Sequence, residues 1–161
     1  MNDSKNQRPN WDEYFIDIMQ SVGTRGTCDR GQVGCVITKE NRILTTGYAG
    51  APSGLAHCDD LGHEMHSVTH LSGETSDHCI RTIHAEQNAI AAAARHGVSI
   101  EGGTLYCKMT PCYTCAKMIC AVGISRVVAW KDYHRGERSR EIFAEAGIQY
   151  DLIINEEQKY D

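Results

Sequence analysis

A histidine and two cysteines near the middle of the chain constrain its fold more than any other feature. His84 opens a His-Ala-Glu triplet, and Cys112 and Cys115 belong to a Pro-Cys-Tyr-Thr-Cys segment. Imidazole nitrogen and thiolate sulfur are ligands that Zn²⁺ prefers, and three protein ligands leave a fourth coordination position open for water. The fold therefore has to bring residues 84, 112 and 115 to one point, where they would form a zinc site of the catalytic kind.

Each half of this candidate site lies where a helix is expected to begin. Residues 84–96 are rich in alanine and are followed by Gly97, a pattern typical of a helix and its end. Thr110 and Pro111 have the residue types of an N-cap and a first helical position. They predict a second helix that opens at the cysteines and ends near Gly123.

The spacing within each half has a structural consequence. Cys112 and Cys115 are three residues apart, so they share one helix face, and the positive end of the helix favours the thiolate. On a regular helix His84 and Glu86 would point ~200° apart, because one turn contains about 3.6 residues. They converge only at the helix entry, which predicts that two helix N-termini face one metal.

The remaining elements predict an α/β fold. A helix is expected where apolar residues follow a helical period, at Trp11, Tyr14, Phe15, Ile18 and Met19. A further helix is expected at 138–146, and the expected strands are residues 33–38, 43–48, 104–109, 126–130 and 148–154. This order predicts three layers, α/β/α, in which helices cover both faces of a mixed five-stranded sheet.

The length of 161 residues fits one domain. We place this domain at residues 11–154, between a mobile tail at residues 1–10 and a C-terminal tail at residues 155–161. Residues 50–80 form an insertion without a convincing period, which contains five histidines. A structureless segment of this length in a compact domain needs a reason, and a functional loop held by a metal would supply one.

Composition narrows the possible functions. The polar start lacks the apolar segment of a secretory signal, so the eight cysteines predict metal binding or catalysis in the cytoplasm rather than disulfides. Three of them are expected to be small buried apolar residues instead: Cys35, Cys107 and Cys120. No apolar run reaches the ~18 residues of a membrane span. The net charge of −5 and the pI of about 5.9 favour a small substrate over a polynucleotide.

His-x-Glu followed by Pro-Cys-x-x-Cys is typical of the zinc deaminases. Zinc lowers the pKa of a bound water toward ~7, and Glu86 would move the proton of that water to the ring nitrogen and the departing ammonia. The alternative is a structural zinc beside a surface glutamate. Asn88 lies on the helix face of His84, where it could bind the substrate or be satisfied by neighbouring backbone.

The sequence resembles the cytidine deaminase superfamily, and within it the deoxycytidylate (dCMP) deaminases, over residues 11–154. The segments that carry the resemblance are residues 25–28, 47–52, 57–58, 84–90, 111–117 and 146–148. The resemblance implies the cytidine-deaminase-like fold, zinc on His84, Cys112 and Cys115, and Glu86 as proton shuttle. It implies hydrolysis of dCMP to dUMP and ammonia.

The resemblance also implies substrate contacts. The backbone near Ala85 would touch the pyrimidine, and Arg25 is the candidate for the 5′-phosphate, since a guanidinium fits phosphate as a multidentate partner. A solvated loop charge is the alternative for Arg25. Arg30 and Tyr133 are weaker candidates.

The family further implies a homo-oligomer, with a hexamer favoured, and control by dCTP or dTTP with Mg²⁺. The candidate regulatory loop contains Gly47, Tyr48, Gly50 and Pro52. One residue departs from the family's usual Gly-Tyr-Asn-Gly, because Ala49 replaces the asparagine that is expected near the nucleotide sugar.

Some family members carry a second, structural zinc at the positions of Cys28 and Cys58. Here the insertion would supply the other two ligands, for which we choose His63 and Cys79. The substitutes are His78, His66, His70 and His57. A second metal would hold the insertion in place; solvated histidines or a pH-sensitive surface are the alternatives.

Other functions share these motifs. A tRNA adenosine deaminase has both zinc motifs, but the net negative charge of the chain and the insertion disfavour this alternative. Deaminases of the riboflavin pathway share the motifs too, but they usually belong to a two-domain chain. A non-catalytic zinc-stabilised nucleotide-binding module is the alternative of another class, which the intact Glu86 disfavours.

Overall fold

The computed structural model describes residues 8–70 and 72–158. The helices are α1 (Trp11–Gly23), α2 (Cys58–Leu61), α3 (Ala85–His96), α4 (Tyr113–Ala121) and α5 (Glu137–Glu145). The strands are β1 (Gly34–Lys39), β2 (Arg42–Tyr48), β3 (Met65–Thr69), β4 (Thr75–Cys79), β5 (Thr104–Met109), β6 (Arg126–Tyr133) and β7 (Gln149–Gln158). The main sheet has five strands in the order β2-β1-β5-β6-β7, in which β1 is antiparallel to β2 and β5, while β5, β6 and β7 are parallel.

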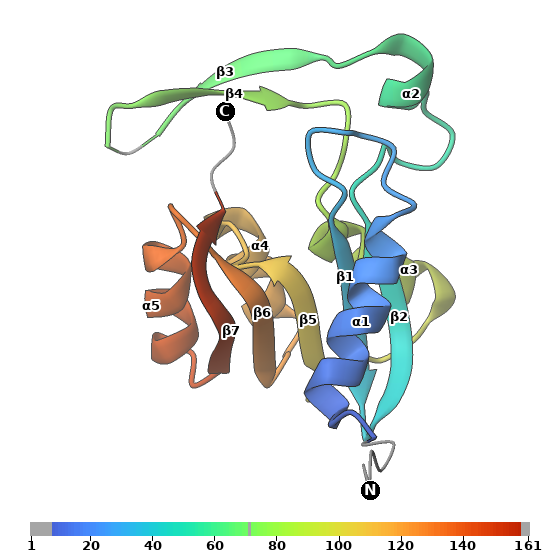
Figure 1. The fold of residues 1–161 in the computed structure, drawn as a ribbon, viewed down its shortest axis with the longest axis vertical. Coiled ribbons are helices and arrows are strands. Elements are labelled where there is room, and N and C mark those ends of the chain that lie inside the picture. Colours follow the sequence, from blue (N-terminus) through green and yellow to red (C-terminus); the bar gives the residue numbers. More distant parts are fainter. Residues whose placement is uncertain (1–7, 71, 159–161) are drawn as a thin grey trace, which may run out of the picture.

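Alternating side chains of the central strands separate two apolar cores. Val36 points toward α1, whereas its neighbours Cys35 and Ile37 point to the opposite core, under α3, α4 and α5. Figure 1 shows α1 on one face of the sheet and these three helices on the other. The predicted three-layer α/β/α fold with a mixed five-stranded sheet is therefore confirmed.

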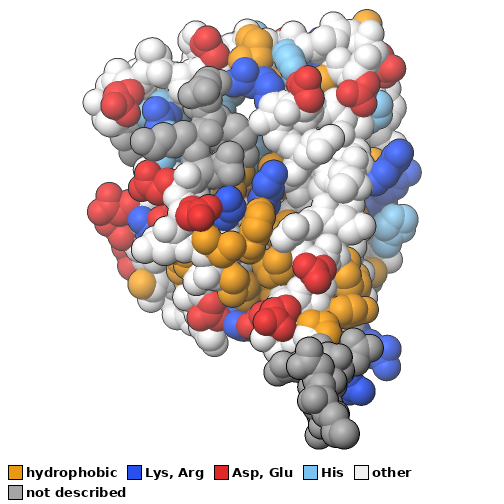
Figure 2. Space-filling model, in the orientation of Figure 1, with side chains coloured by type: hydrophobic (Ala, Val, Ile, Leu, Met, Phe, Trp, Pro, Cys, Tyr) orange, Lys and Arg blue, Asp and Glu red, His pale blue; other side chains and the backbone are white. Residues whose placement is uncertain are grey.

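The first helix buries a different stripe from the one expected. Phe15 and Met19 are buried as predicted, but Ile16 joins them, while Trp11 and Tyr14 remain 54% and 44% exposed. The cause is that α1 packs on β1, β5 and β2 and against Val128 of β6, while among the described residues no helix packs closely on its outer side. Beside α1 lies a groove of about 660 Å³, whose other wall is formed by Trp130 of β6 and Ile153 of β7. Figure 2 shows the apolar side chains gathered on this face.

The insertion is more ordered than the sequence indicated. Within residues 50–80 the structure places the short helix α2 and a hairpin of β3 and β4, which pair from Met65↔Cys79 to Thr69↔Thr75. The expectation of a structureless loop was wrong, because neither strand shows the apolar alternation of a half-buried strand and every residue of β3 is exposed.

The C-terminal strand also differs from its expected length. It continues to Gln158, so most of the expected tail at 155–161 is paired with β6 as far as Tyr133↔Gln158. Of the predicted mobile tail at residues 1–10, residues 1–7 lie outside the described residues. Among the described residues, none of the helices has the length and the apolar character that crossing a bilayer requires.

A charged cluster ties α1 to the parallel strands. Asp12 accepts hydrogen bonds from Tyr106 at 2.7 Å and from both terminal nitrogens of Arg126 at 2.8 Å. Arg126 also donates to Asp151 at 2.7 Å. The hydrogen bonds from Arg126 hold the pKa of Asp12 below its ordinary value, so this carboxylate is charged at neutral pH.

We expect Asp12→Asn to destabilise the fold by about 1–3 kcal/mol near pH 7, because Arg126 then donates to a neutral amide instead of a charged carboxylate. A lowered carboxyl pKa contributes stability above the unfolded value of ~4 and loses it as the pH falls through the native value. The difference in urea-unfolding free energy between wild type and Asp12→Asn should therefore shrink below pH ~4. Asp17→Asn, an exposed aspartate on the same helix, is the control, and an equal effect of both variants would contradict the assignment.

Candidate functional site

The fold brings together the three residues of the central motif. The ligand atoms of His84, Cys112 and Cys115 all lie within 4.8 Å of one another. His84 Nδ1 is 3.5 Å from the sulfur of Cys112 and 3.4 Å from the sulfur of Cys115. Cys115 is buried and His84 is exposed, so this three-ligand cluster opens to solvent on its His84 side.

Two helix starts create this convergence. His84 is the N-cap of α3 and Cys112 the N-cap of α4, both in extended backbone conformation. Glu86 lies in the first turn of α3, directly after His84, so its carboxylate can face the sulfur of Cys115. The predicted start of α4 was too early: Thr110 is not the cap, because its hydroxyl contacts Asp132 and Tyr150 instead.

Glu86 lies next to the cluster and out of water. Its side chain is 6% exposed, and its carboxylate is 4.0 Å from the sulfur of Cys115. Burial raises the pKa of Glu86, and the imidazolium of His84 partly offsets this effect. A carboxyl group with a raised pKa can both take up and release a proton near neutral pH.

The electrostatics of the cluster favour a thiolate. A hydrogen bond from Cys115 lowers the pKa of Cys112 to about 4, and the same bond raises the pKa of Cys115. Hydrogen bonding to Cys112 raises the pKa of His84 to about 9. Metal binding requires the deprotonated forms of these groups. The donor set of a catalytic zinc is matched by two sulfurs and one imidazole, with the fourth position open.

The loop before the insertion is pressed against the start of α3. A Cβ on Gly47 would lie 2.4 Å from both Ala85 O and Ala89 N, so only glycine allows this approach. Asn88 then donates its side-chain amide to the carbonyl oxygen of Tyr48 at 2.9 Å. Strand β2 and the loop that follows it are thereby fixed relative to the helix that carries Glu86.

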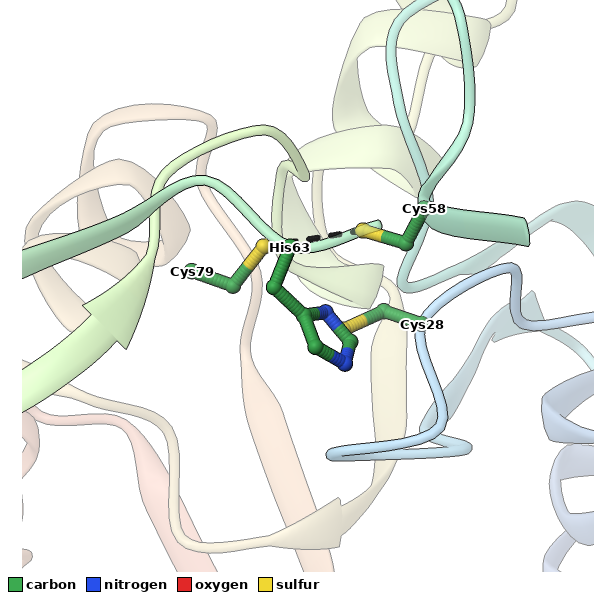
Figure 3. A group of neighbouring side chains, drawn as sticks. All are labelled: Cys28, Cys58, His63 and Cys79. Atoms are coloured by element: carbon green, nitrogen blue, oxygen red, sulfur yellow. Dashed lines mark hydrogen bonds between the residues drawn. The ribbon is translucent and has the colours of Figure 1, made fainter. Parts of the chain in front are cut away.

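A second group of metal-ligand side chains lies in the insertion. Cys28, Cys58, His63 and Cys79 have their ligand atoms within 4.8 Å of one another. Figure 3 shows them converging from the loop after α1, from α2 and the turn that follows it, and from the end of β4. The sulfurs of Cys58 and Cys79 are 3.5 Å apart, and all cysteines are reduced. Three sulfurs and one imidazole complete a tetrahedron, as structural zinc requires.

This four-ligand cluster has an oriented histidine. His63 directs Nδ1 to Cys28 at 3.5 Å, and its Nε2 is 2.9 Å from a carboxylate oxygen of Asp29. A carboxylate on the far nitrogen is the usual partner of a metal-bound histidine. Burial raises the pKa of Cys79, but hydrogen bonds from the backbone amides of Glu64 and Arg81 and from the side chains of His63 and Cys58 together lower it to about 7.

The substitute ligands lie elsewhere. The Nε2 of His78 is 2.7 Å from the hydroxyl of Ser76, so His78 does not join the four-ligand cluster; β-strand alternation turns it to the other face from Cys79. His57 contacts Thr27 at 3.0 Å, and His70 also contacts Ser76. His66 is opposite His78 in the hairpin.

The residues expected to contact the substrate come from several separate segments of the chain. Arg25 is exposed in the turn after α1, and Arg30 donates to the carbonyl oxygen of Asp77 at 3.4 Å. The loop of Gly47, Tyr48, Gly50 and Pro52 ends in a bridge from Gly50 to Ile83, next to His84. Ala85 is buried at the start of α3. Tyr133 lies at the end of β6, where burial raises its pKa and the charge of Cys112 also acts on it.

One positioning network was not foreseen. The hydroxyl of Thr110 donates to Asp132 at 2.6 Å, and the same carboxylate oxygen accepts from the backbone of Tyr133 and from Arg140. This network joins the segment before Cys112 to the loop after β6. No local pattern could have indicated it, because Thr110 and Asp132 are 22 residues apart.

Comparison with known proteins identifies the family. The family model of the "Cytidine and deoxycytidylate deaminase zinc-binding region" matches residues 9–131, which contain both clusters. The chain belongs to this zinc-binding deaminase family.

Several relatives are similar over most of the chain. The deoxycytidylate deaminase of Mycobacterium phage D29 is 39% identical over 130 residues, which are 78% of this chain and 98% of the phage protein. The deoxycytidylate deaminase of Schizosaccharomyces pombe is 34% identical over 142 residues, 88% of this chain but only 44% of the yeast protein. The dCMP deaminase of cyanophage S-TIM5, solved with dCMP and dUMP, has a TM-score of 0.71 and 26% identity, covering 91% of this chain and 98% of that chain.

The contact of Gly47 with α3 leads to a prediction. Gly47→Ala should lower the free energy of unfolding by about 1–3 kcal/mol, because the added methyl group meets backbone atoms that cannot rotate away. Displacement of α3 should also weaken the three-ligand cluster, seen as less metal retained per chain. Thr46→Ala, on the exposed side of the same strand, is the control. Unchanged stability of Gly47→Ala would show that β2 can withdraw from the helix.

Proposed function

We propose that this protein hydrolyses the exocyclic amine of a cytosine nucleotide, converting dCMP to dUMP and ammonia. The observation that carries the proposal is the arrangement of Glu86 beside the three-ligand cluster of His84, Cys112 and Cys115. Family membership and the similarity to deoxycytidylate deaminases support the choice of dCMP.

The roles follow from chemistry. A zinc ion held by His84, Cys112 and Cys115 would make a water molecule acidic enough to attack at neutral pH. Glu86 takes a proton from the attacking water and delivers it to the ring nitrogen N3. Glu86 then takes the proton of the new C4 hydroxyl and transfers it to the amine nitrogen, so that ammonia leaves as the bond between C4 and this nitrogen breaks and C4 becomes a carbonyl. One water is consumed and one ammonia released.

Removing the proton carrier tests this assignment. We expect Glu86→Gln to lower kcat for dCMP by about 10²- to 10⁴-fold, since the amide keeps the shape but cannot shuttle a proton. Zinc content should stay at the wild-type level because Glu86 is not a ligand. Ammonia release and metal analysis of the same sample check both points. The matched control is Glu101→Gln, a glutamate far from the cluster in sequence and exposed. Unchanged activity of Glu86→Gln would contradict the proposed mechanism.

The substrate class needs its own panel. Ammonia release is measured with dCMP, dCTP, deoxycytidine, CMP and a tRNA anticodon stem-loop. Turnover of the stem-loop alone would assign a tRNA deaminase, and turnover of none would favour a binding module.

The four-ligand cluster is proposed to hold a structural zinc on Cys28, Cys58, His63 and Cys79. We expect about two zinc ions per wild-type chain and about one in Cys58→Ser, which loses one ligand of the closed site. Cys120→Ser, outside both clusters, is the control and should retain two. Atomic-emission analysis of purified protein measures the ratio. A wild-type ratio near one would remove the second site.

Further properties are proposed from the family resemblance. The domain is placed from residue 11 to the end of β7 at Gln158. The groups proposed to surround the nucleotide are Arg25, Arg30, Tyr133, Asn88 and the backbone of Ala85. The protein would work in the cytoplasm as a homo-oligomer, with a hexamer favoured. The loop of Gly47, Tyr48, Gly50 and Pro52 would bind dCTP or dTTP with Mg²⁺ as an effector.

A further inference from the structure

The hydroxyl of Thr110 lies at a buried junction of four elements, two residues before the first cysteine of the three-ligand cluster. It donates to Asp132 of β6 at 2.6 Å, and it is 2.8 Å from the hydroxyl of Tyr150 on β7. Arg140 of α5 donates to the same oxygen of Asp132 at 2.6 Å. Thr110 is 2% exposed and directly follows β5, so β5, β6, β7 and α5 meet at this one side chain.

The ion pair at this junction fixes the direction of its hydrogen bonds. Asp132 is paired with Arg140, and a carboxylate only accepts, so the single proton of the Thr110 hydroxyl goes to Asp132. The same hydroxyl then accepts from Tyr150, whose pKa is raised by burial, and from the backbone N–H of Tyr133 at 3.4 Å. One donated and two accepted bonds are all that a hydroxyl can form. Valine has the same shape but can form none of them.

The direction of Asp132 depends on an irregularity in the sheet. Trp130 packs toward α1, so strict alternation would turn Asp132 to that face as well. The pairing of β6 with β7 instead shifts its register between Lys131 and Asp132. Asp132 therefore faces Arg140 of α5, on the opposite side of the sheet. Irregularities of this kind recur next to active sites, where they redirect a side chain.

A stiff segment links the junction to Cys112. The backbone N–H of Thr110 donates to the carbonyl oxygen of Lys131 at 3.0 Å, so both its main chain and its side chain are held. A residue before proline is restricted to extended conformations, and the ring of Pro111 fixes its own φ. Pro111 is fully buried, and Cys112 follows in the extended conformation of an N-cap. Few soft torsions therefore separate the anchored hydroxyl from the sulfur, and a shift of Thr110 moves Cys112 with it.

The two branches of the Thr110 side chain have separate contacts. The methyl group is packed by the loop after β6, where an added Cβ on Gly136 would be 2.7 Å away. The hydroxyl makes the polar contacts with Asp132 and Tyr150. Serine keeps the hydroxyl and valine keeps the packing, so the two substitutions separate the polar anchor from the shape of the side chain.

We propose that Asp132 is a positioning residue, which acts through the hydroxyl of Thr110 to hold the sulfur of Cys112 beside His84 for metal binding. The inference rests on the proposed function, in which the three-ligand cluster holds the zinc. Residues that hold a ligand without touching the metal commonly change metal affinity or activity by about 10- to 100-fold. Without the anchor, the start of α4 loses its fixed position relative to α3.

Zinc affinity of the intact protein tests the anchor without turnover. A chromophoric chelator competes for zinc and gives the dissociation constant of each bound ion. Thr110→Val should weaken one ion about 10- to 100-fold, while Thr110→Ser should stay within about threefold of wild type. Any ion held by the four-ligand cluster should keep its affinity. Wild-type affinity in Thr110→Val would overturn the proposal.

The matched control removes a hydroxyl at the other end of the same strand. Ser125, just before β6, donates to the carbonyl oxygens of Gly102 and Gly103. Ser125→Ala should leave zinc affinity unchanged, although it also loses an anchoring hydroxyl. If Ser125→Ala weakens zinc as much as Thr110→Val does, the effect is one of general stability and the proposal is overturned.

A double variant tests whether Asp132 acts through Thr110. Asp132→Ala should weaken zinc in the same direction as Thr110→Val. Combining the two should weaken it no further than the stronger single variant, because both remove one shared contact. Effects that multiply would show separate roles and overturn the assignment. If Thr110→Val does not fold, the comparison of Asp132→Ala with Ser125→Ala decides the same question.

Turnover separates positioning from substrate binding. With zinc saturating, Thr110→Val should lower kcat for dCMP about tenfold or more and leave KM within about threefold, because a metal ligand has moved. A raised KM at constant kcat would contradict the positioning role. Zinc binding that depends on Thr110 in a protein that does not turn over dCMP would remove the proposed function alone. Turnover of dCMP with zinc affinity insensitive to Thr110→Val would remove the positioning role alone.

Discussion

The convergence of two helix N-termini at one end of the sheet is the constraint on which the rest of this structure depends. His84 and Cys112 are caps, in extended conformation, and each helix starts directly after them. The two starts are held separately: Gly47 lets β2 touch the first turns of α3, and the hydroxyl of Thr110 anchors the segment before α4 to Asp132. Because both helix N-termini carry partial positive charge, the same point favours a thiolate and a bound metal's anionic ligands. Catalytic geometry is thus a property of the scaffold rather than of one loop.

The insertion is stabilised differently from the main sheet, since it has almost no apolar core of its own. β3 is exposed along its whole length. What fixes the hairpin is polar: the four-ligand cluster at its base and the contacts of Arg30 and Arg135 with Asp77, Ser76 and Glu74. A metal bound at the base would supply the free energy that apolar burial supplies elsewhere. The position of Ser76 and His78 therefore depends on the four-ligand cluster at the base of the hairpin.

Local patterns predicted the layers of the fold and the three-ligand cluster, because helix periods, caps and ligand types are short-range signals. The four-ligand cluster was expected from the family resemblance, which supplied Cys28 and Cys58, and from the ligand types available in the insertion. They failed where the deciding contact is distant. Thr110 has the residue type of an N-cap, but a buried hydrogen bond to Asp132, 22 residues away, takes its hydroxyl. Trp11 has the helical spacing of a core residue, but in the described part of the chain no helix packs closely on the outer side of α1. The hairpin was missed because its strands show no apolar alternation, and Arg135 because its partners Ser76 and Glu74 are about 60 residues earlier in the chain.

Ala49 shows how recognition can shift without disturbing the scaffold. Its backbone N–H donates to Val33 at 2.9 Å, and its carbonyl oxygen accepts from Thr27 at 3.1 Å. Both bonds use only main-chain atoms, so they hold the loop in the same shape whatever the side chain. An alanine at a position where the family usually has asparagine therefore changes the side chain that the loop presents and leaves the backbone of the loop in place.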